Sequence, residues 1–322
     1  MRWLMWVLCL LLAMPAWAQH VQNDRRIAIT IDDLPMQAMS SAPAGDWAEW
    51  HTKLMVQLKQ ANAPITGFVN EEKLEADGQV DPARLAMLDD WLEAGFDLGN
   101  HTYAHKSLHD IGVPAFQQSI LDGERQLRPL MAKHGKSPRW FRHPFLRNGI
   151  TPADKQAMDE FLAQHGYRVA PVTVDNSEWV WAIAYRRVLN GETQVNDRDA
   201  ALERLRLGYV PYMLNKLDYY EAQSVELLGY KVPQVWLMHT NELNADTFAE
   251  LIAATRRRGY TMITLDEAMR DPAYQRADGY TGKWGPSWLH RWAMAEKKPR
   301  DFYKGEPVVP KWVLEMAQVE SE

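Results

Sequence analysis

Short apolar runs alternate with longer stretches of helical spacing along most of the chain. The apolar runs predict seven strands, at residues 27–31, 65–69, 97–99, 140–142, 168–174, 234–238 and 261–264. Between them, apolar residues recur at intervals of three and four, which predicts helices over 47–60, 82–93, 116–133, 152–164 and 247–258. Because strands and helices alternate, we expect a parallel sheet with helical crossovers, built as a barrel or as a doubly wound sheet.

The last predicted helix has clear end signals. Asn244 and Asp246 are both candidate N-caps, and Gly259 follows the last turn. Two other regions depart from the alternation. Residues 182–230 are charged, rich in tyrosine and of helical spacing, and we interpret them as a helical insertion before the sixth strand. Residues 275–322 are rich in Trp, Pro and Lys, and we interpret them as a C-terminal extension packed on the barrel.

The composition is that of an ordinary globular protein. The 322 residues are 46% apolar and 24% charged, which argues against a largely disordered or collagen-like chain. The chain has 36 basic and 42 acidic residues, a formal net charge of −6. This balance argues against a general nucleic-acid binder.

The N-terminus has the features of a secretory signal peptide over residues 1–18. A run of uncharged, mostly apolar residues at 3–14 is followed by a small-x-small triplet at 16–18, so we predict cleavage before Gln19 and export to a bacterial periplasm. An uncleaved anchor is the alternative. Cys9 is the only cysteine, so the processed chain would have no disulfide. No later segment has the roughly 18 apolar residues of a membrane span.

Chemically versatile side chains follow most of the predicted strands. They are Asp32 and Asp33 after the first, His101 after the third, Arg142 closing the fourth, Asp175 after the fifth and His239 after the sixth. Because the carboxyl ends of parallel strands share one face, we expect these side chains to converge. A lone Asp after a strand is often only an Asx-turn. Two adjacent ones can divide their roles, one holding a cation and the other accepting a proton from water.

His101 and His105 are four residues apart in the segment Asn-His-Thr-Tyr-Ala-His. On a helical turn this spacing places both imidazoles on one face, a geometry suited to a divalent metal. With Asp33 there would be three ligands and a fourth position for water. A structural role for the pair is the alternative. Two His and one Asp suit Zn²⁺, with Co²⁺ or another divalent ion as alternatives.

In this order the residues resemble the polysaccharide deacetylases with NodB homology, carbohydrate esterase family 4. Five motifs match within about residues 26–270, at 30–33, 101–105, 142–145, 175–179 and 237–239. The resemblance implies a distorted (β/α)7 barrel with a catalytic domain over 19–274. The chain departs from the family where Leu34-Pro35 replaces a glycine and where Glu178 replaces a second Asp.

The resemblance also implies roles for particular residues. Asp33, His101 and His105 would bind the metal, Asp32 would be the general base and His239 the general acid. Arg142 would orient Asp32, and Phe145 would offer its backbone N–H to the oxyanion. Trp179 and Leu237 would line the pocket for the acetyl methyl. Asp175 would also be a catalytic residue. The sequence does not decide whether Asp175 or Glu178 is the acid that supports Arg142.

These observations predict a metal-dependent hydrolase that removes N-acetyl groups from a glycan such as peptidoglycan. Two other interpretations stay open. One is a hydrolase of another ester or non-peptide C–N bond, and the other is a carbohydrate-binding relative without catalysis. The expected partner is an N-acetylated glycan, whereas the oligomeric state is not set by the sequence.

Overall fold

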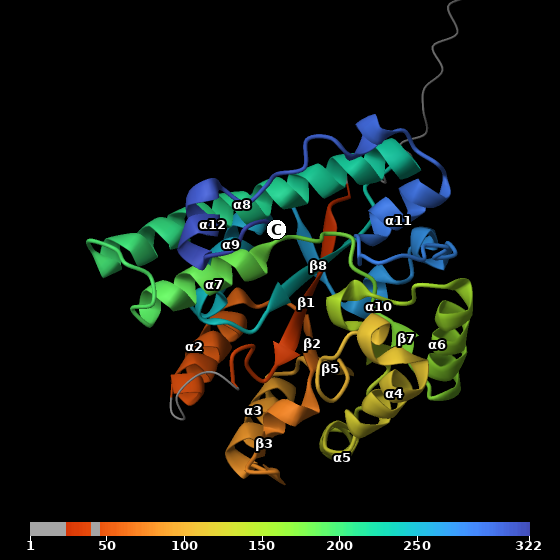
Figure 1. Cartoon of the computed structure of the whole chain (residues 1–322), viewed down its shortest axis with the longest axis horizontal. Coiled ribbons are helices and arrows are strands. Elements are labelled where there is room, and N and C mark those ends of the chain that lie inside the picture. Colours follow the sequence, from red (N-terminus) through yellow and green to blue (C-terminus); the bar gives the residue numbers. More distant parts are fainter. Residues whose placement is uncertain (1–23, 40–45) are drawn as a thin grey trace, which may run out of the picture.

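Parallel strands form a curled sheet in the computed structural model, which describes residues 24–39 and 46–322 (Figure 1). The strands are β1 (Arg26–Leu34), β2 (Ile65–Val69), β5 (Asp97–Asn100), β6 (Trp140–Phe141), β7 (Arg168–Val169), β8 (Gln234–His239) and β9 (Thr261–Ile263). They form a seven-stranded sheet in the order β7-β6-β5-β2-β1-β8, with β9 beside β1. Every pairing within this sheet is parallel, as the alternation of elements predicts.

The sheet curls into a distorted barrel. Along one edge of β1 lies β8, and along the other edge β9 pairs with residues 26–28 and β2 with residues 29–34. The sheet is also closed on its far side, because Val174 forms an isolated parallel bridge with Trp236 of β8. The fifth predicted strand is therefore shorter than expected, since β7 ends at Val169 and only the bridge continues it.

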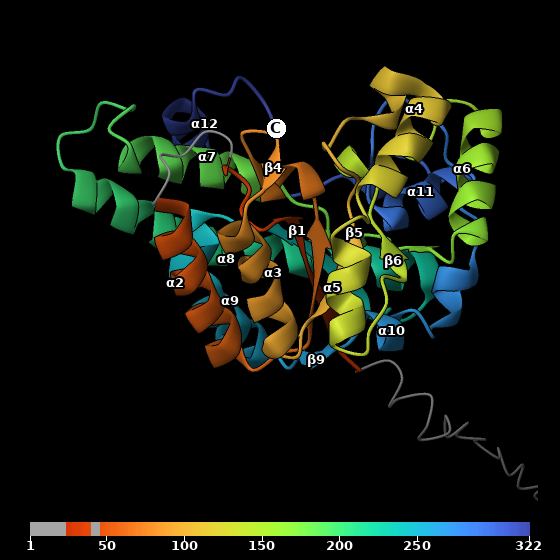
Figure 2. The ribbon, with the colours of Figure 1, turned by 90° about the horizontal axis from the view of Figure 1, so that it is seen from below.

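Helices surround the outer face of the sheet, and Figure 2 shows α2, α3 and α5 one after another along it. These outer helices are α2 (Asp46–Ala61), α3 (Pro82–Glu93), α4 (Leu108–Asp122), α5 (Leu127–Lys133), α6 (Pro152–Gln164) and α9 (Glu242–Arg257). The prediction of one helix over 116–133 is wrong, because the chain turns at Gly123 and α5 starts anew. The helix predicted over 247–258 is α9, and it starts earlier than predicted. Its N-cap is Asn241, whose side chain accepts a hydrogen bond from Asn244 N at 2.9 Å.

Of the two helices here, α8 (Arg198–Leu228) lies within the predicted insertion at 182–230, whereas α7 (Glu178–Leu189) starts four residues before it. Figure 1 shows the long α8 crossing the barrel. Its buried residues recur at helical spacing, among them Leu205, Tyr209, Met213 and Leu217. Asp197 caps its start, and Gly229 ends it at φ 83°, a left-handed conformation that glycine adopts without strain.

The C-terminal segment packs against these helices. It contains α11 (Trp288–Ala295), η4 (Arg300–Tyr303) and α12 (Lys311–Ala317), and α12 packs on α7. Trp288 and Trp292 are buried, and the ring of Trp312 lies edge-on to that of Trp181 at 5.6 Å between centroids. The shorter elements are η1 (Glu71–Leu74), β3 (Glu75–Ala76), β4 (Gln79–Val80), η2 (Pro144–Leu146), α10 (Leu265–Ala268) and η3 (Pro272–Gln275).

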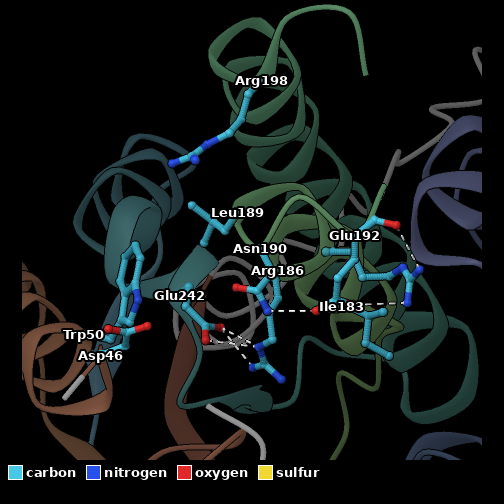
Figure 3. A pocket seen from close by; sticks show the side chains of 10 residues that line it. Asp46, Trp50, Ile183, Arg186, Leu189, Asn190, Glu192, Arg198 and Glu242 are labelled. Carbon is cyan, nitrogen blue, oxygen red and sulfur yellow. Dashed lines mark hydrogen bonds and ion pairs between the residues drawn. The ribbon is translucent and has the colours of Figure 1, made fainter. Parts of the chain in front are cut away.

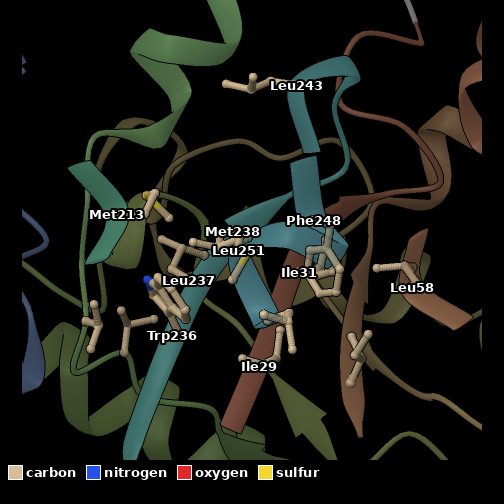
Figure 4. Packing of buried hydrophobic residues seen from close by; sticks show 14 of the residues in the cluster. Ile29, Ile31, Leu58, Met213, Trp236, Leu237, Met238, Leu243, Phe248 and Leu251 are labelled. Carbon is tan, nitrogen blue, oxygen red and sulfur yellow. The ribbon is translucent and has the colours of Figure 1, made fainter. Parts of the chain in front are cut away.

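The largest apolar core lies between the sheet and its covering helices (Figure 4). Ile29 and Ile31 of β1 pack with Trp236 and Met238 of β8, and Phe248 and Leu251 of α9 close the layer. Each such buried side chain stabilises the fold by about 1.5–3 kcal/mol. The two central strands therefore hold their carboxyl ends in fixed positions.

The predicted signal peptide, residues 1–18, lies outside the described residues, and so does Cys9. Among the described residues, no helix combines the length and apolar character needed to span a membrane.

Candidate metal and active site

The carboxyl ends of β1, β5 and β8 open into a cavity of about 570 Å³. Nine of the residues predicted for the site line it: Asp32, Asp33, His101, His105, Phe145, Asp175, Trp179, Leu237 and His239. Arg142 lies behind them and is fully buried. Residues as far apart in the chain as Asp32 and His239 are thus brought to one place, because parallel strands end on the same face of the sheet.

Asp33, His101 and His105 form a group that could hold a metal ion. Asp33 Oδ1 lies 3.6 Å from His105 Nε2 and 3.9 Å from His101 Nε2. Two ligand atoms that each lie about 2.0–2.2 Å from one tetrahedral ion are roughly 3.3–3.6 Å apart. Asp33 Oδ1 is buried and has no hydrogen-bond partner within the described part of the chain. The ligand atoms of the three side chains all lie within 4.8 Å of one another, so they can hold a divalent ion once they draw together around it.

The ring of His101 is oriented for metal binding by its other nitrogen. Nδ1 lies 2.8 Å from the carbonyl oxygen of Arg142. A carbonyl can only accept, so Nδ1 carries the hydrogen and Nε2 offers its lone pair toward Asp33. Burial lowers the pKa of both His101 and His105. Both rings are therefore held in the neutral form that a metal requires.

The ligand-bearing loop is irregular rather than helical, and the prediction of a helical turn at residues 101–105 is wrong. Thr102 has φ 69° and His105 φ 52°, both in the left-handed region. Two hydrogen bonds hold this path, from Thr102 N to Asn100 Oδ1 at 2.7 Å and from Asn70 Nδ2 to His101 O at 2.6 Å. Asp33 has φ 73° as well. Such strain persists only where the surroundings impose it, and it clusters at functional sites.

Asp32 is the acid next to the metal group. Its Oδ2 lies 3.7 Å from His101 Nε2 and 3.8 Å from Arg142 Nε. Burial raises the pKa of Asp32 to about 6, although the charge of Arg142 acts in the opposite direction. Arg142 is itself fixed, since its Nη2 donates to Thr30 Oγ1 at 2.8 Å. Asp32 is therefore a buried carboxyl that can exchange a proton near neutral pH.

His239, at the end of β8, is paired with Glu178. Its Nδ1 lies 2.7 Å from Glu178 Oε2, and Glu178 is fully buried. The other oxygen of Glu178 accepts from the amides of Asn241 and Asn244. Burial lowers the pKa of His239, but the charge of Glu178 and its hydrogen bond outweigh this effect and raise it to about 9. The imidazole is thus held protonated at neutral pH.

The acid beside Arg142 is neither Asp175 nor Glu178, the two that the sequence suggested. In the described structure, neither Asp175 nor Glu178 forms an ion pair with Arg142, whose carboxylate neighbour is Asp32. Glu178 holds His239 instead, and sequence reasoning missed this pairing. Asp175 faces the cavity, and burial raises its pKa to about 6. Asp175 acts on Arg142 only at longer range, through its charge.

A second feature that the sequence did not reveal is Lys73 of η1. Its Nζ donates to the backbone oxygen of Asp33 at 3.0 Å and lies 3.5 Å from Asp33 Oδ1. Only 14% of its side chain is exposed. Burial opposes ionisation of Asp33, but the charge of Lys73 is the largest opposing cause, and the pKa of Asp33 is held well below its usual range. The carboxylate is therefore ionised and ready to bind a cation.

Another cavity, of about 420 Å³, lies between α2 and α7 (Figure 3). Two of its three arginines, Arg186 and Arg187, are paired within the protein. Arg186 donates to both oxygens of Glu242, at 3.0 and 2.9 Å, and Arg187 pairs with Glu192 at 3.3 Å. Since no metal-ligating trio lies there among the described residues, the chemically active groups are those at the strand ends.

Comparison with known proteins shows which family the N-terminal half of the chain resembles. Residues 19–170 match the family model described as Polysaccharide deacetylase. A peptidoglycan-N-acetylglucosamine deacetylase of Bacillus cereus is 26% identical over 160 residues, 49% of this chain and 47% of the relative. This chain therefore matches about half the length of that curated relative.

Solved structures of low sequence identity also align with the chain. The peptidoglycan deacetylase PdaC from Bacillus subtilis is 19% identical, covering 79% of this chain and 98% of its own, with a TM-score of 0.46. A CE4 family pseudoenzyme from Bacillus anthracis is 14% identical, covering 77% and 66% of the two chains, with a TM-score of 0.47.

Proposed function

We propose that this chain, whose residues 19–170 match the polysaccharide deacetylase family model, is a metal-dependent hydrolase that removes N-acetyl groups from a glycan. The observation that carries the proposal is the geometry of one cavity. A metal-ligating trio lies beside a carboxyl with a raised pKa, and a protonated imidazole faces the same space. Amide hydrolysis needs these elements, because water must be activated and a poor leaving group must be protonated.

Asp33, His101 and His105 would hold the ion, and Zn²⁺ suits this donor set, with Co²⁺ as an alternative. When bound, a divalent ion polarises the acyl carbonyl and lowers the pKa of water from about 15.7 to about 7. Asp32 accepts the proton of the attacking water, since its pKa of about 6 allows it to be ionised at neutral pH. Arg142 stays buried behind Asp32 and keeps its carboxylate in place.

His239 donates a proton to the nitrogen that leaves. Glu178 keeps its imidazole charged and fixes the ring through Nδ1, so Nε2–H is left to face the substrate. Leu237 and Trp179 line the cavity and offer apolar surface to the acetyl methyl group. The Phe145 turn would offer a backbone N–H to the developing oxyanion.

Acetate release tests the proposal. The protein is incubated with peptidoglycan, chitin oligomers and acetylated xylan, with and without a chelator, and with the metal restored. We expect metal-dependent release from an N-acetylated glycan. Release from xylan alone would instead indicate an esterase, and glycan binding without release by the metal-loaded protein would indicate a non-catalytic relative.

The predicted signal peptide suggests the compartment in which the protein would meet its substrate. We propose that residues 1–18 direct export to the periplasm, where peptidoglycan is accessible. Fractionation of cells that produce the full chain, followed by N-terminal sequencing, tests this. Export is expected to leave a mature protein that begins at Gln19, whereas a membrane-retained, uncleaved chain would contradict it.

Lys73→Met is expected to tighten metal binding at least tenfold. The ammonium lies 3.5 Å from Asp33 Oδ1 and would repel a divalent ion bound there. At an effective dielectric constant of about 20 and a separation near 5 Å, this repulsion is on the order of several kcal/mol. Loss of the hydrogen bond to the backbone oxygen of Asp33 removes only about 1 kcal/mol. Competition with a chromogenic chelator measures the affinity.

The matched control for Lys73→Met is Lys106→Met. Lys106 is exposed and follows His105 in the chain, so its removal takes away one nearby positive charge without touching Asp33. We expect less than a threefold change for this control. Weaker metal binding in Lys73→Met would show that Lys73 mainly holds Asp33 in its ligating position.

A further inference from the structure

Within residues 24–39 and 46–322, the exposed aromatic side chains line one cavity. Among the described residues, seven large apolar side chains are exposed, and only two of them are aromatic, Phe145 at 53% and Trp284 at 64%. Both line the cavity that contains Asp33 and His105. Aromatic side chains bury a large apolar area when they can, so two exposed rings in one cavity are unlike the rest of the surface.

Phe145 belongs to the part of this cavity next to the metal group. Its ring lies edge-on to the ring of His105, with 4.7 Å between centroids. The residue has φ 59° within η2, so the backbone is strained in the conformation that presents the ring. Phe145 is therefore the exposed aromatic residue that lies beside the metal group, and a substrate bound there would contact its ring.

Trp284 comes from the C-terminal extension, outside residues 19–170. The next residue, Gly285, lies against the Phe145 turn so closely that a Cβ there would come within 2.0 Å of Phe145 O. Only a glycine allows this approach, which sets Trp284 beside the turn. The contact of Trp284 with Lys283, whose Nζ is 5.0 Å from the ring centroid, is exposed and leaves most of the indole free.

The extension is anchored on both sides of Trp284. Arg291 is fully buried, donates to Leu146 O and pairs with Asp278 at 3.0 Å. Ser287 Oγ donates to Thr173 O at 2.7 Å, and Trp288 N donates to Val172 O at 2.8 Å. The segment is therefore tied both to the turn that carries Phe145 and to the chain after β7. Trp284 is a fixed part of the cavity wall.

We propose that Trp284 and Phe145 form a glycan subsite in which Trp284 stacks on the sugar ring next to the one that is deacetylated. The proposal rests on the proposed function and extends it, since it makes the substrate an N-acetylated oligosaccharide of at least two sugar units. A pyranose ring has an apolar face of C–H groups that packs well on an indole, while its hydroxyls stay hydrated at the rim. Polar groups that line the same cavity suit those hydroxyls, and they include Asp175, Lys216 and Glu306.

The test compares Trp284→Ala with the wild type on N-acetylated chitin oligomers and on the single sugar. We expect the KM for oligomers to rise about tenfold more than the KM for the single sugar, while kcat on oligomers falls less than threefold. Trp284→Phe keeps an aromatic face. Its rise in log KM for oligomers is expected to be at most half of the rise in Trp284→Ala. Val308→Ala is the control, because Val308 is 70% exposed on the same extension and does not line the cavity.

Binding to the chelator-treated protein separates this proposal from the proposed function. Isothermal calorimetry with chitin oligomers is expected to show weaker binding to Trp284→Ala than to the wild type even when no acetate is released. Oligomer binding that depends on Trp284 in a metal-loaded protein without acetate release would keep the subsite and reject the deacetylase. Acetate release with equal oligomer KM in wild type and Trp284→Ala would keep the deacetylase and reject the subsite.

Discussion

Asp33→Ala is expected to lose bound metal and acetate release together, whereas Asp32→Asn keeps the metal and loses turnover. Asp33 is the carboxylate shared by the two imidazoles, at 3.6 and 3.9 Å. Without it, two histidines are left, and the affinity for Zn²⁺ should fall at least a hundredfold. Asp32 Oδ2 lies 3.7 Å from His101 Nε2, next to the place where a metal-held water would be, so its loss should lower kcat by about 10²- to 10⁴-fold, the usual contribution of a general base.

Metal content of the two purified variants, measured by mass spectrometry after dialysis, distinguishes these roles. The substitutions are adjacent in sequence and equally buried, so a general loss of structure would affect both alike. Circular dichroism of each variant checks that it is folded. Full metal occupancy and rate in Asp33→Ala would reject the proposed ligand set, and loss of metal in Asp32→Asn would assign that carboxylate to the ion as well.

The strand pattern predicts most of the fold because its signals are local. The runs at 65–69 and 234–238 coincide with β2 and nearly with β8, since buried parallel strands are short apolar runs with abrupt ends. The placement of the candidate site follows from the same signal. Once the strands are parallel, the residues after them must share one face, and the cavity lined by Asp32, His101 and His239 lies there.

Other features depend on contacts that no local pattern encodes. Lys73 reaches Asp33 across a separation of 40 residues, and Glu178 meets His239 across 61. The irregular loop at 101–105 also depends on a distant contact, because Asn70 donates to His101 O across 31 residues, whereas the hydrogen bond from Thr102 N to Asn100 is local. The spacing of the two histidines therefore identifies them as a pair but predicts a helical turn where the backbone is irregular. The Gly123 break between α4 and α5 is missed because apolar spacing runs on across it.

Glu178→Gln is expected to move the alkaline limit of activity to lower pH and to reduce kcat at neutral pH. In the wild type, the pKa of His239 is raised to about 9, so the acid form persists up to that pH. Glutamine removes the largest of the charges that oppose the effect of burial, so the pKa of His239 falls from about 9. The protonated fraction at pH 7.5 falls accordingly, and kcat should drop by about 10²- to 10³-fold.

The same substitution has a stability signature with a defined sign. A group whose pKa is raised in the folded state stabilises that state at low pH and loses this effect as pH rises through the folded pKa. The His239 contribution in the wild type should thus be fully present below about pH 6.5 and disappear toward pH 9. Urea unfolding from pH 6 to pH 9.5 is expected to show this slope in the wild type and to lack it in Glu178→Gln.

Glu242→Gln is the matched control, since Glu242 is also a buried acid near the end of β8 but pairs with Arg186 at 2.9 Å instead of His239. Its loss is expected to lower stability without moving the alkaline limit of kcat. Comparison of the two variants distinguishes Glu242, a buried charge that supports the fold, from Glu178, a buried charge that keeps the leaving-group acid His239 protonated. An alkaline limit that stays near pH 9 in Glu178→Gln would show that His239 does not donate the proton in the rate-limiting step.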